Sequence, residues 1–338
     1  MIREEWKHGN RGVSVIICCY NSAERIGATL SALAAQEFQT ILDWEIILVD
    51  NASTDLTAGI ADSIWTSLQT GIDLRIVYEG EPGLGNARNA GIREARYSVL
   101  LFCDDDNWLS PGYVQGVFRA LDGDRNLAAC GGRGIPVFET GKPEWFDEYA
   151  EAFAVGSQEL NTEDGRLLNL YGAGLAVRKE ALDRLYLTGF MALMKGRTGS
   201  QLSSSEDTEL TYAFVLMGYR LQYLPELSFS HYLPAARLRF DYLKRIFTAF
   251  GADGPVRNLY YAHISHRCSH KRIRNWSWHL ALALFRVCKY ALFPPKKRGR
   301  VIYFRWNKAY IRQLFALRGE YPQILANIAV VSEISGIS

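Results

Sequence analysis

The sequence has no long uncharged hydrophobic run and no disulfide framework. It contains no apolar stretch of about 18 residues without a charge, and residues 1–11 are polar, so we expect neither a membrane-spanning helix nor a secretory signal. The six cysteines do not follow the spacing of a disulfide scaffold, and four of them lie in apolar runs. We therefore expect reduced, mostly buried thiols in a cytoplasmic protein.

Two common phosphate-binding patterns are also missing. The chain has no Gly-Lys-Ser/Thr phosphate loop, and Gly83-x-Gly85 continues without the third glycine of a dinucleotide fingerprint. These absences argue against a P-loop enzyme and a Rossmann oxidoreductase. What is present is the composition of a folded globular chain, with 48% hydrophobic and 22% charged residues over 338 positions.

Charge is unevenly distributed along the chain. Residues 234–318 contain 19 Lys and Arg but only two acids, whereas the rest contains 19 against 34, and the net charge is +2. A basic block of this size favours an anionic partner, which is a membrane surface, a phosphorylated substrate or nucleic acid.

Over the first 130 residues, short β-branched runs alternate with helix-like segments, which predicts an α/β fold with a mostly parallel sheet. The expected strands cover residues 13–19, 45–49, 74–78, 98–103, 128–132 and 174–177. Ser22 is the expected cap of the first helix, with Glu24 in its first turn. We expect one compact unit over residues 1–233 and a helical, basic appendage over 234–338, with a break at Pro294-Pro295.

Three adjacent carboxylates, Asp104 to Asp106, follow the apolar run at residues 99–103. At the carboxyl end of a strand in an open α/β sheet, their repulsion is tolerable if a divalent cation bridges them to a phosphate. Alternate side chains of an extended segment point the same way, so Asp104 and Asp106 can converge on one ligand while Asp105 faces elsewhere. The alternative is a solvated acidic turn before the next helix.

Other strand ends carry candidate nucleotide contacts. Tyr20 and Asn21 follow the first expected strand, and Asp50 and Ser53 follow the second. An aromatic ring can lie against a base, and a carboxylate can accept a hydrogen bond from a base imide or a ribose hydroxyl. Turn chemistry also explains each residue taken singly, but together they indicate one face of the fold.

The sequence resembles the inverting glycosyltransferases of family 2, which have the GT-A fold and move sugars from nucleotide diphosphates. The resemblance covers about residues 12–240 and rests on the order of several short motifs. These motifs are Tyr20-Asn21, Asp50 to Asp55, Gly85 to Gly91 around Arg88-Asn89, Asp104-x-Asp106, Gly172-Ala173-Gly174, Glu206-Asp207 and His231. Cys18, Cys19 and Asn107 depart from the usual family pattern.

The resemblance implies a role for each matched residue. Asp50 would contact the nucleobase of the donor, Asp104 would hold the ribose or the metal, and Asp106 would ligate Mg²⁺ or Mn²⁺. The expected donor-binding residues are Tyr20, Asn21, Glu24, Asp50, Ser53, Arg88, Asp104 and Asp105, and the expected metal ligands are Asp106 and His231.

His231 ends an alternating segment, residues 228–231, that we expect to return to the site. A neutral imidazole suits Mn²⁺, whereas a hydrogen-bonded structural histidine is the alternative. Arg88 and Arg237 are candidate contacts to the diphosphate.

The reaction also needs a base. Inverting transfer is an in-line displacement, so one carboxylate must take the proton of the acceptor hydroxyl. Residues 203–209 supply three acids at an expected helix start, and the resemblance selects Asp207 among them. The structural alternative is a capping box at Ser203-x-x-Glu206, with first-turn acids favouring the helix dipole.

The expected partners are a UDP-sugar or another nucleotide sugar, and a glycan or polyprenyl-diphosphate-linked acceptor. On residues 275–293, helical spacing places Trp276, Leu280 and Leu284 on an apolar side and His279 and Arg286 on a polar stripe. A basic cluster follows, which predicts an interfacial helix on the anionic inner face of the plasma membrane. The alternative is packing against the acidic remainder of the chain.

Two rival functions stay open at this point. A nucleic-acid-binding module would use the basic block and its tryptophans, but it leaves Asp104 to Asp106 unexplained, so we expect no nucleic acid partner. A sugar nucleotidyltransferase usually opens with a Gly- and Arg-rich phosphate loop, whereas the first strand here ends in Cys-Cys-Tyr-Asn. The His263 to His270 segment has the composition of a zinc site, but its basic surroundings disfavour a cation.

Overall fold

The computed structural model describes residues 10–159, 165–194, 205–265, 275–292 and 297–333. The chain forms two compact units. The first joins Met1–Leu187 to Tyr219–Pro234, and the second joins Thr188–Gly218 to Ala235–Ser338. Residue 207, the expected base, therefore groups with the C-terminal helices, whereas residue 231 groups with the first unit.

One eight-stranded sheet organises the described part of the first unit. Its strands are β1 (Asn10–Cys19), β2 (Trp44–Asn51), β3 (Leu74–Glu79), β4 (Tyr97–Asp104), β5 (Asn107–Leu109), β6 (Leu127–Phe138), β7 (Ala176–Arg178) and β8 (Arg220–Leu233). They lie in the order β3-β2-β1-β4-β7-β6-β8-β5. The neighbouring strands β3, β2, β1 and β4 pair in parallel, and so do β6 and β8. Strand β7 pairs antiparallel with β4 and β6, and β5 pairs antiparallel with β8. The expected mostly parallel α/β fold is confirmed.

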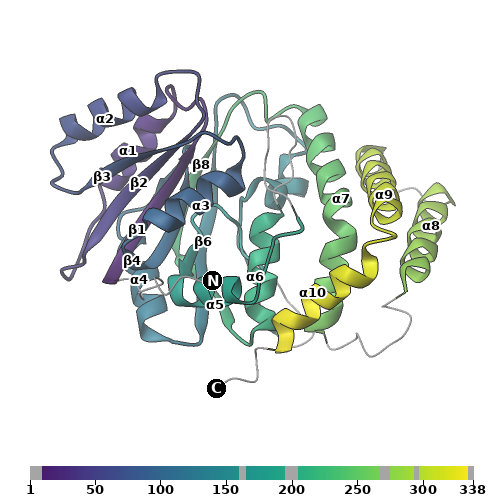
Figure 1. Cartoon of the computed structure of the whole chain (residues 1–338). Coiled ribbons are helices and arrows are strands. Elements are labelled where there is room, and N and C mark those ends of the chain that lie inside the picture. Colours follow the sequence, from purple (N-terminus) through teal and green to yellow (C-terminus); the bar gives the residue numbers. More distant parts are fainter. Residues whose placement is uncertain (1–9, 160–164, 195–204, 266–274, 293–296, 334–338) are drawn as a thin grey trace. The chain divides into compact units, whose positions relative to one another are not determined.

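Helices cover both faces of this sheet (Figure 1). Helices α1 (Ile26–Ala34), α2 (Thr57–Leu68) and α4 (Tyr113–Gly123) share one core cluster with alternate residues of β1, namely Val13, Val15 and Ile17. On the other face, α3 (Leu84–Glu94) approaches so closely that a Cβ at Gly91 would lie 2.4 Å from Cγ2 of Ile16. Because both faces are covered, the central strands are continuous apolar runs.

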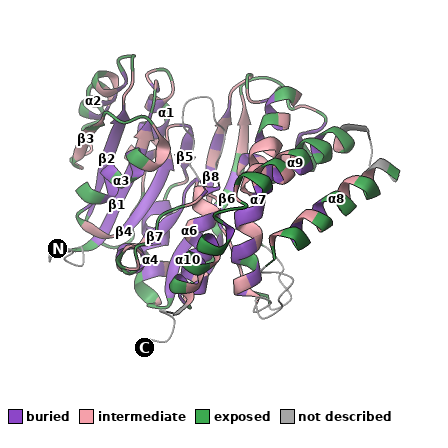
Figure 2. Ribbon diagram, turned by 45° about the vertical axis from the view of Figure 1, so that its right-hand side comes forward, coloured by how far each residue is buried: buried purple, intermediate pink, exposed green. Residues whose placement is uncertain are grey.

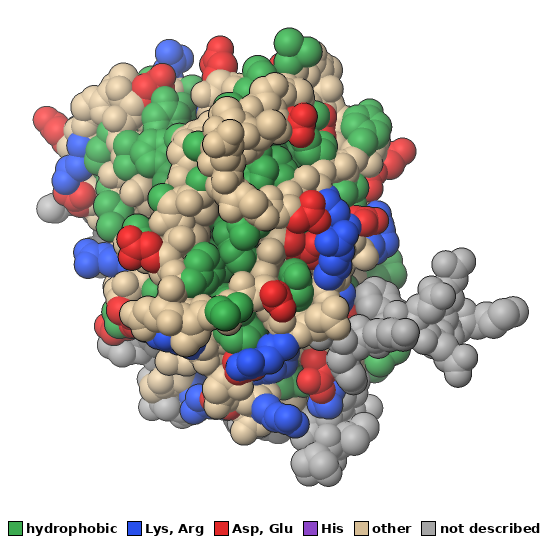
Figure 3. Space-filling view, turned by 90° about the vertical axis from the view of Figure 1, so that its left-hand side faces the viewer, with side chains coloured by type: hydrophobic (Ala, Val, Ile, Leu, Met, Phe, Trp, Pro, Cys, Tyr) green, Lys and Arg blue, Asp and Glu red, His purple; other side chains and the backbone are tan. Residues whose placement is uncertain are grey.

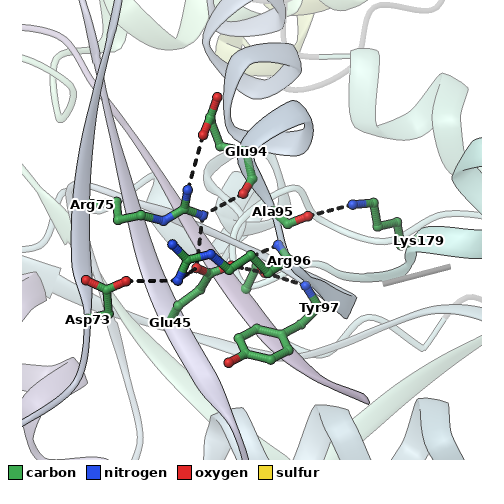
Figure 4. Close-up of polar contacts among 9 residues, drawn as sticks. Glu45, Asp73, Arg75, Glu94, Ala95, Arg96, Tyr97 and Lys179 are labelled. Atoms are coloured by element: carbon green, nitrogen blue, oxygen red, sulfur yellow. Dashed lines mark hydrogen bonds and ion pairs between the residues drawn. The ribbon is translucent and has the colours of Figure 1, made fainter. Parts of the chain in front are cut away.

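A buried carboxylate fixes the amino end of the sheet (Figure 4). Glu45 at the start of β2 is 1% exposed and accepts hydrogen bonds from the Ser14 hydroxyl (2.8 Å) and the Arg96 amide (2.9 Å). Its other oxygen lies 2.9 Å from Arg75 of β3. Three strands are thus tied at the end opposite to the carboxyl ends of β1, β2 and β4.

The start of the first helix differs from the expectation. Helix α1 begins at Ile26 with no side-chain cap, so Ser22 does not cap it and Glu24 precedes its first turn. The Ser22 hydroxyl instead donates to the carboxylate of Asp105, 83 residues away. A long-range contact has replaced the local one that the sequence pattern predicts.

The second unit is helical, as expected. Its described helices are α6 (Glu206–Leu216), α7 (Phe240–Ile264), α8 (Trp276–Leu292), α9 (Lys297–Ala316) and α10 (Tyr321–Glu333). The backbone of α9 packs against α7 at Gly251, where a Cβ would lie 2.2 Å from the carbonyl oxygen of Trp306. The expected break at Pro294-Pro295 lies outside the described residues, between the end of α8 and the start of α9. None of the helices in the described ranges is long and apolar enough to span a bilayer.

Candidate active site

The register of three parallel strands brings two of the predicted carboxylates to the same edge. Cys19 of β1 pairs with Asp50 of β2, and Cys18 pairs with Asp104 of β4. Asp50 and Asp104 therefore flank the end of β1, with backbones about 10 Å apart at the usual strand spacing. The carboxyl ends of the strands are where open α/β sheets bind ligands.

Hydrogen bonds hold the loops after β1 and β2 together. Asn21 has a left-handed backbone (φ 50°), and its backbone amide donates to the Ser53 hydroxyl at 3.0 Å. Its side-chain oxygen accepts from the Thr54 amide at 2.8 Å, while a carboxylate oxygen of Asp50 accepts from the Ser53 amide at 3.1 Å. Asn21 and Ser53 thus hold the two loops together, and their expected contacts with a donor stay predictions. The adjacent Tyr20 exposes 55% of its surface.

Asp105 ties the acidic segment to α1. Its carboxylate lies 2.7 Å from Arg25 and accepts from Ser22, and its backbone oxygen accepts from the Thr29 hydroxyl at 2.8 Å. Burial raises the pKa of this carboxyl, the charge of Asp106 adds to that effect, and Arg25 opposes it. Asp105 faces α1, and its predicted contact with a donor stays a prediction.

His231 reaches the acidic segment through an antiparallel pairing of β5 with β8. It lies opposite Asn107, and its Nε2 is 3.6 Å from Oδ1 of Asp106. The Tyr232 amide donates to the backbone oxygen of Asp106 at 2.9 Å, and the Asp106 and His231 side chains are both buried. Residues 228–231 thus lie against the acidic segment, and the expected role of His231 as a metal ligand stays a prediction.

The donor set at this point suits a divalent cation bound together with a phosphate. An imidazole nitrogen and a carboxylate oxygen are both ligands of Mn²⁺, and Mg²⁺ favours carboxylates with phosphate oxygens. In the described residues, no three or more His, Cys, Asp or Glu side chains gather as a metal site. Asp106 and His231 would thus be a partial ligand set that the diphosphate completes.

Arg88 lies on α3 with its guanidinium 5.3 Å from the ring centroid of Phe102 in β4. It is 7% exposed, and its expected contact with a diphosphate stays a prediction. Glu24, the other expected donor contact beside α1, is exposed in the turn that precedes the helix.

The Gly172-Ala173-Gly174 motif has a structural reason. Gly174 has a φ of 68°, and the buried Tyr113 hydroxyl donates to its carbonyl at 2.8 Å. A Cβ at Gly174 would lie 2.6 Å from that hydroxyl. Both the positive φ and this close approach therefore require glycine at this position. The same hydroxyl accepts from the Gly132 amide, which joins α4, β6 and the segment before β7.

Asp207 lies in the first turn of α6 in the second unit, and the Thr211 hydroxyl donates to its backbone oxygen at 2.9 Å. Its role as a base stays a prediction. Ser203 of the alternative capping box lies outside the described residues. The zinc-like segment is only partly described: the Nδ1 of His263 lies 2.9 Å from the Leu259 carbonyl oxygen, and residues 266–270 lie outside the described ranges.

Glu209, the third acid of this helix start, was not distinguished by the sequence pattern. It is buried, and its carboxylate accepts from the amides of Leu193 (2.8 Å) and Met194 (2.6 Å) and from the Tyr260 hydroxyl (2.9 Å). Burial raises the pKa of this carboxyl to about 7, against the effect of these hydrogen bonds. Through these hydrogen bonds, Glu209 of α6 connects Leu193 and Met194 to Tyr260 of α7.

Comparisons with known proteins identify the family and the fold. A family model described as glycosyl transferase family 2 matches residues 14–186. The putative glycosyltransferase EpsH of Bacillus subtilis is 30% identical over 118 residues, which are 35% of this chain and 33% of EpsH. The chain thus spans about a third of the length of this curated relative.

Two solved structures have a similar fold. The first is Staphylococcus aureus TarS 1–349 in complex with UDP-GlcNAc, with 16% identity and a TM-score of 0.50 over 96% of this chain and 90% of that one. The second is the mannosyltransferase PcManGT of Pyrobaculum calidifontis in complex with GDP-Man and Mn²⁺, with 17% identity and a TM-score of 0.51 over 97% and 88%. These likenesses indicate the GT-A fold.

Proposed function

This chain belongs to glycosyl transferase family 2, and we propose that it transfers a sugar from a nucleotide-diphosphate sugar to a hydroxyl group of its acceptor with inversion at the anomeric carbon. The observation that carries the proposal is the pairing of Asp106 with His231 beside Asp104 and Asp50, at the carboxyl edge of β2, β1 and β4. An anionic diphosphate next to these acids requires a cation between them, and the imidazole supplies a neutral ligand for it.

In this proposal the first unit holds the donor. Asp50 accepts a hydrogen bond from the nucleobase, and the exposed ring of Tyr20 lies against that nucleobase. Asp104 contacts the ribose or the cation. Asp106 and His231 hold Mn²⁺ or Mg²⁺, which stabilises the negative charge of the departing diphosphate. Arg88 provides a further positive charge next to the donor.

Asp207 of α6 is the proposed base. It takes the proton of the acceptor hydroxyl as that oxygen attacks the anomeric carbon, and the bond to the diphosphate breaks on the opposite side. Glu209 has another role, because it is buried and holds backbone amides.

The proposed donor is a UDP-sugar, and the proposed acceptor is a glycan or a polyprenyl-diphosphate-linked glycan of a surface polysaccharide. The UDP-GlcNAc bound to TarS and the GDP-Man and Mn²⁺ bound to PcManGT support a nucleotide sugar and a divalent cation. These two complexes do not select the nucleobase of the donor, so a donor screen has to include GDP- and dTDP-sugars.

The experiment is a comparison of Asp207→Asn with Glu206→Gln, its neighbour in the same helical turn. Asp207→Asn should retain donor affinity but lower turnover by about 10² to 10⁴, the usual contribution of a positioned base. Glu206→Gln is the matched control and should keep turnover within a few-fold of wild type. Wild-type turnover in Asp207→Asn would remove this residue from the mechanism, and loss only in Glu206→Gln would assign the base there.

A further inference from the structure

Helices α8 and α9 of the second unit pack against each other in antiparallel directions. Near one end the Trp276 indole donates to the Leu314 carbonyl, and near the other the rings of Tyr290 and Tyr303 lie 3.8 Å apart. Ala283, between these contacts on α8, is buried. The pair therefore has an inner side, formed by these contacts, and an outer side that faces solvent.

The inner side carries two of the polar residues of α8. His279 is buried, and Arg286 lines a pocket of about 270 Å³ together with Asn258 and Tyr261 of α7. The predicted polar stripe therefore turns inward at His279 and Arg286, whereas Lys289 is exposed. The predicted apolar side is wrong in part, because Trp276 packs its indole on α9. Tertiary packing has selected a different face from the one that hydropathy indicated.

The outer side is apolar on α8. Trp278, Phe285 and Leu292 recur every seven residues, so they share one side of the helix, and all three are exposed. On α9 the exposed residues Val301, Lys308 and Phe315 follow the same seven-residue spacing. We call these six residues the outer face. Figure 2 shows that exposed residues run along both helices, in contrast to the buried strands of the first unit.

Helices α8 and α9, which form the outer face, carry only basic charged residues, although Asp241 of α7 interacts with Arg305 of α9. Residues 276–316 contain nine Lys and Arg and no Asp or Glu, and Lys289, Arg305 and Arg312 are exposed among the apolar side chains. By contrast, the side of the first unit that carries the edge strand β3 mixes acidic and basic side chains (Figure 3). A partner of the outer face must therefore combine an apolar layer with negative charge.

We propose that the outer face docks on the surface of an anionic lipid bilayer. Phe285, Leu292 and the other apolar side chains enter the boundary between headgroups and acyl chains, and the surrounding Lys and Arg contact lipid phosphates. A second copy of the chain is a poorer occupant, because a two-fold interface would bring two such basic surfaces together. This inference does not depend on the donor or on the sugar transferred.

The test is flotation of the full chain with vesicles of phosphatidylcholine alone or of equimolar phosphatidylcholine and phosphatidylglycerol. Wild type should float with the anionic vesicles only and should be released by high salt. The double variant Lys308→Gln/Arg312→Gln should bind anionic vesicles about 25-fold more weakly, because each cation near such a surface strengthens binding about fivefold. Phe285→Ser should also weaken binding, and it should not alter the unfolding temperature because the ring is 66% exposed.

Two matched controls lie in the first unit. Arg125→Gln removes an exposed cation and Ile41→Ser an exposed apolar side chain, and both should float like wild type. Wild-type binding in Phe285→Ser and in the double Gln variant, equal binding to both vesicle types, or no binding to either would overturn the proposal. Self-association that Phe285→Ser abolishes, without vesicle binding, would replace the membrane with a second copy as the occupant.

Discussion

At the residue scale, the proposed cation site combines a histidine and an aspartate that are 125 positions apart in the chain. We expect His231→Ala to weaken UDP binding strongly in the presence of Mn²⁺ and little in its absence, because the variant removes a proposed metal ligand and no proposed nucleotide contact. The measurement is calorimetric titration of UDP with and without Mn²⁺. His263→Ala, a histidine in α7 of the second unit, is the control. Equal losses under both conditions would make His231 a structural residue.

Glu209 is expected to make stability depend on pH. Its pKa is raised from 4.5 to about 7, so its favourable contribution is complete below the unfolded value and is lost as pH rises through the folded value. The loss is on the order of 3 kcal/mol in the free energy of unfolding, at 1.36 kcal/mol for each pKa unit. Glu209→Gln should remove this dependence, because the amide stays neutral.

Urea unfolding at about pH 5 and about pH 8 measures this effect, with the exposed Glu320→Gln of the same unit as the control. Wild type and the control should lose stability between these two conditions by more than Glu209→Gln does. An identical pH dependence in all three proteins would show that Glu209 titrates at similar pH in the folded and unfolded chains.

At the element scale, Glu45 is expected to hold the amino end of the sheet. Glu45→Ala removes a buried partner of Arg75 and Ser14, and breaking a buried pair of this kind costs about 3 kcal/mol or more. The matched control is Glu180→Ala, which removes an exposed ion pair with Arg184 and should cost at most about 1 kcal/mol. Denaturant titration measures both variants, and equal losses would contradict the structural role of Glu45.

The sequence predicts those elements that depend on local patterns. The runs at 13–19 and 98–103 become β1 and β4 because both sheet faces are covered, so hydropathy alone marks them. The carboxyl-edge position of Asp50 and Asp104 follows from these strands in the same way.

Contacts between distant segments explain what the sequence could not show. Ser22 bonds to Asp105 instead of capping α1, and Glu209 becomes buried by contact with Tyr260 of another helix. The inward turn of His279 and Arg286 is set by the neighbours of α8, so the spacing of polar residues along the helix did not reveal it. Each of these features depends on partners that local periodicity does not encode.

At the scale of the whole molecule, the proposed donor ligands and the proposed lipid-binding surface belong to different units. The acids that we propose to hold the donor belong to the sheet, whereas the basic surface proposed for lipid belongs to helices α8 and α9. A nucleotide site in the first unit and a lipid site in the second should therefore respond to different variants. Phe285→Ser is expected to leave UDP affinity unchanged, which calorimetry with Mn²⁺ can establish.

The most direct test of the central claim is the unfolding temperature of the wild-type chain with UDP, GDP and dTDP, each with and without Mn²⁺. A nucleotide present at 100 times its Kd should stabilise the folded chain by about 2.7 kcal/mol. We predict a clear upward shift with UDP that needs Mn²⁺ and that Asp106→Asn abolishes. No shift with any of the three nucleotides, or a shift of the same size in Asp106→Asn, would contradict a nucleotide-sugar site at the carboxyl edge of the sheet.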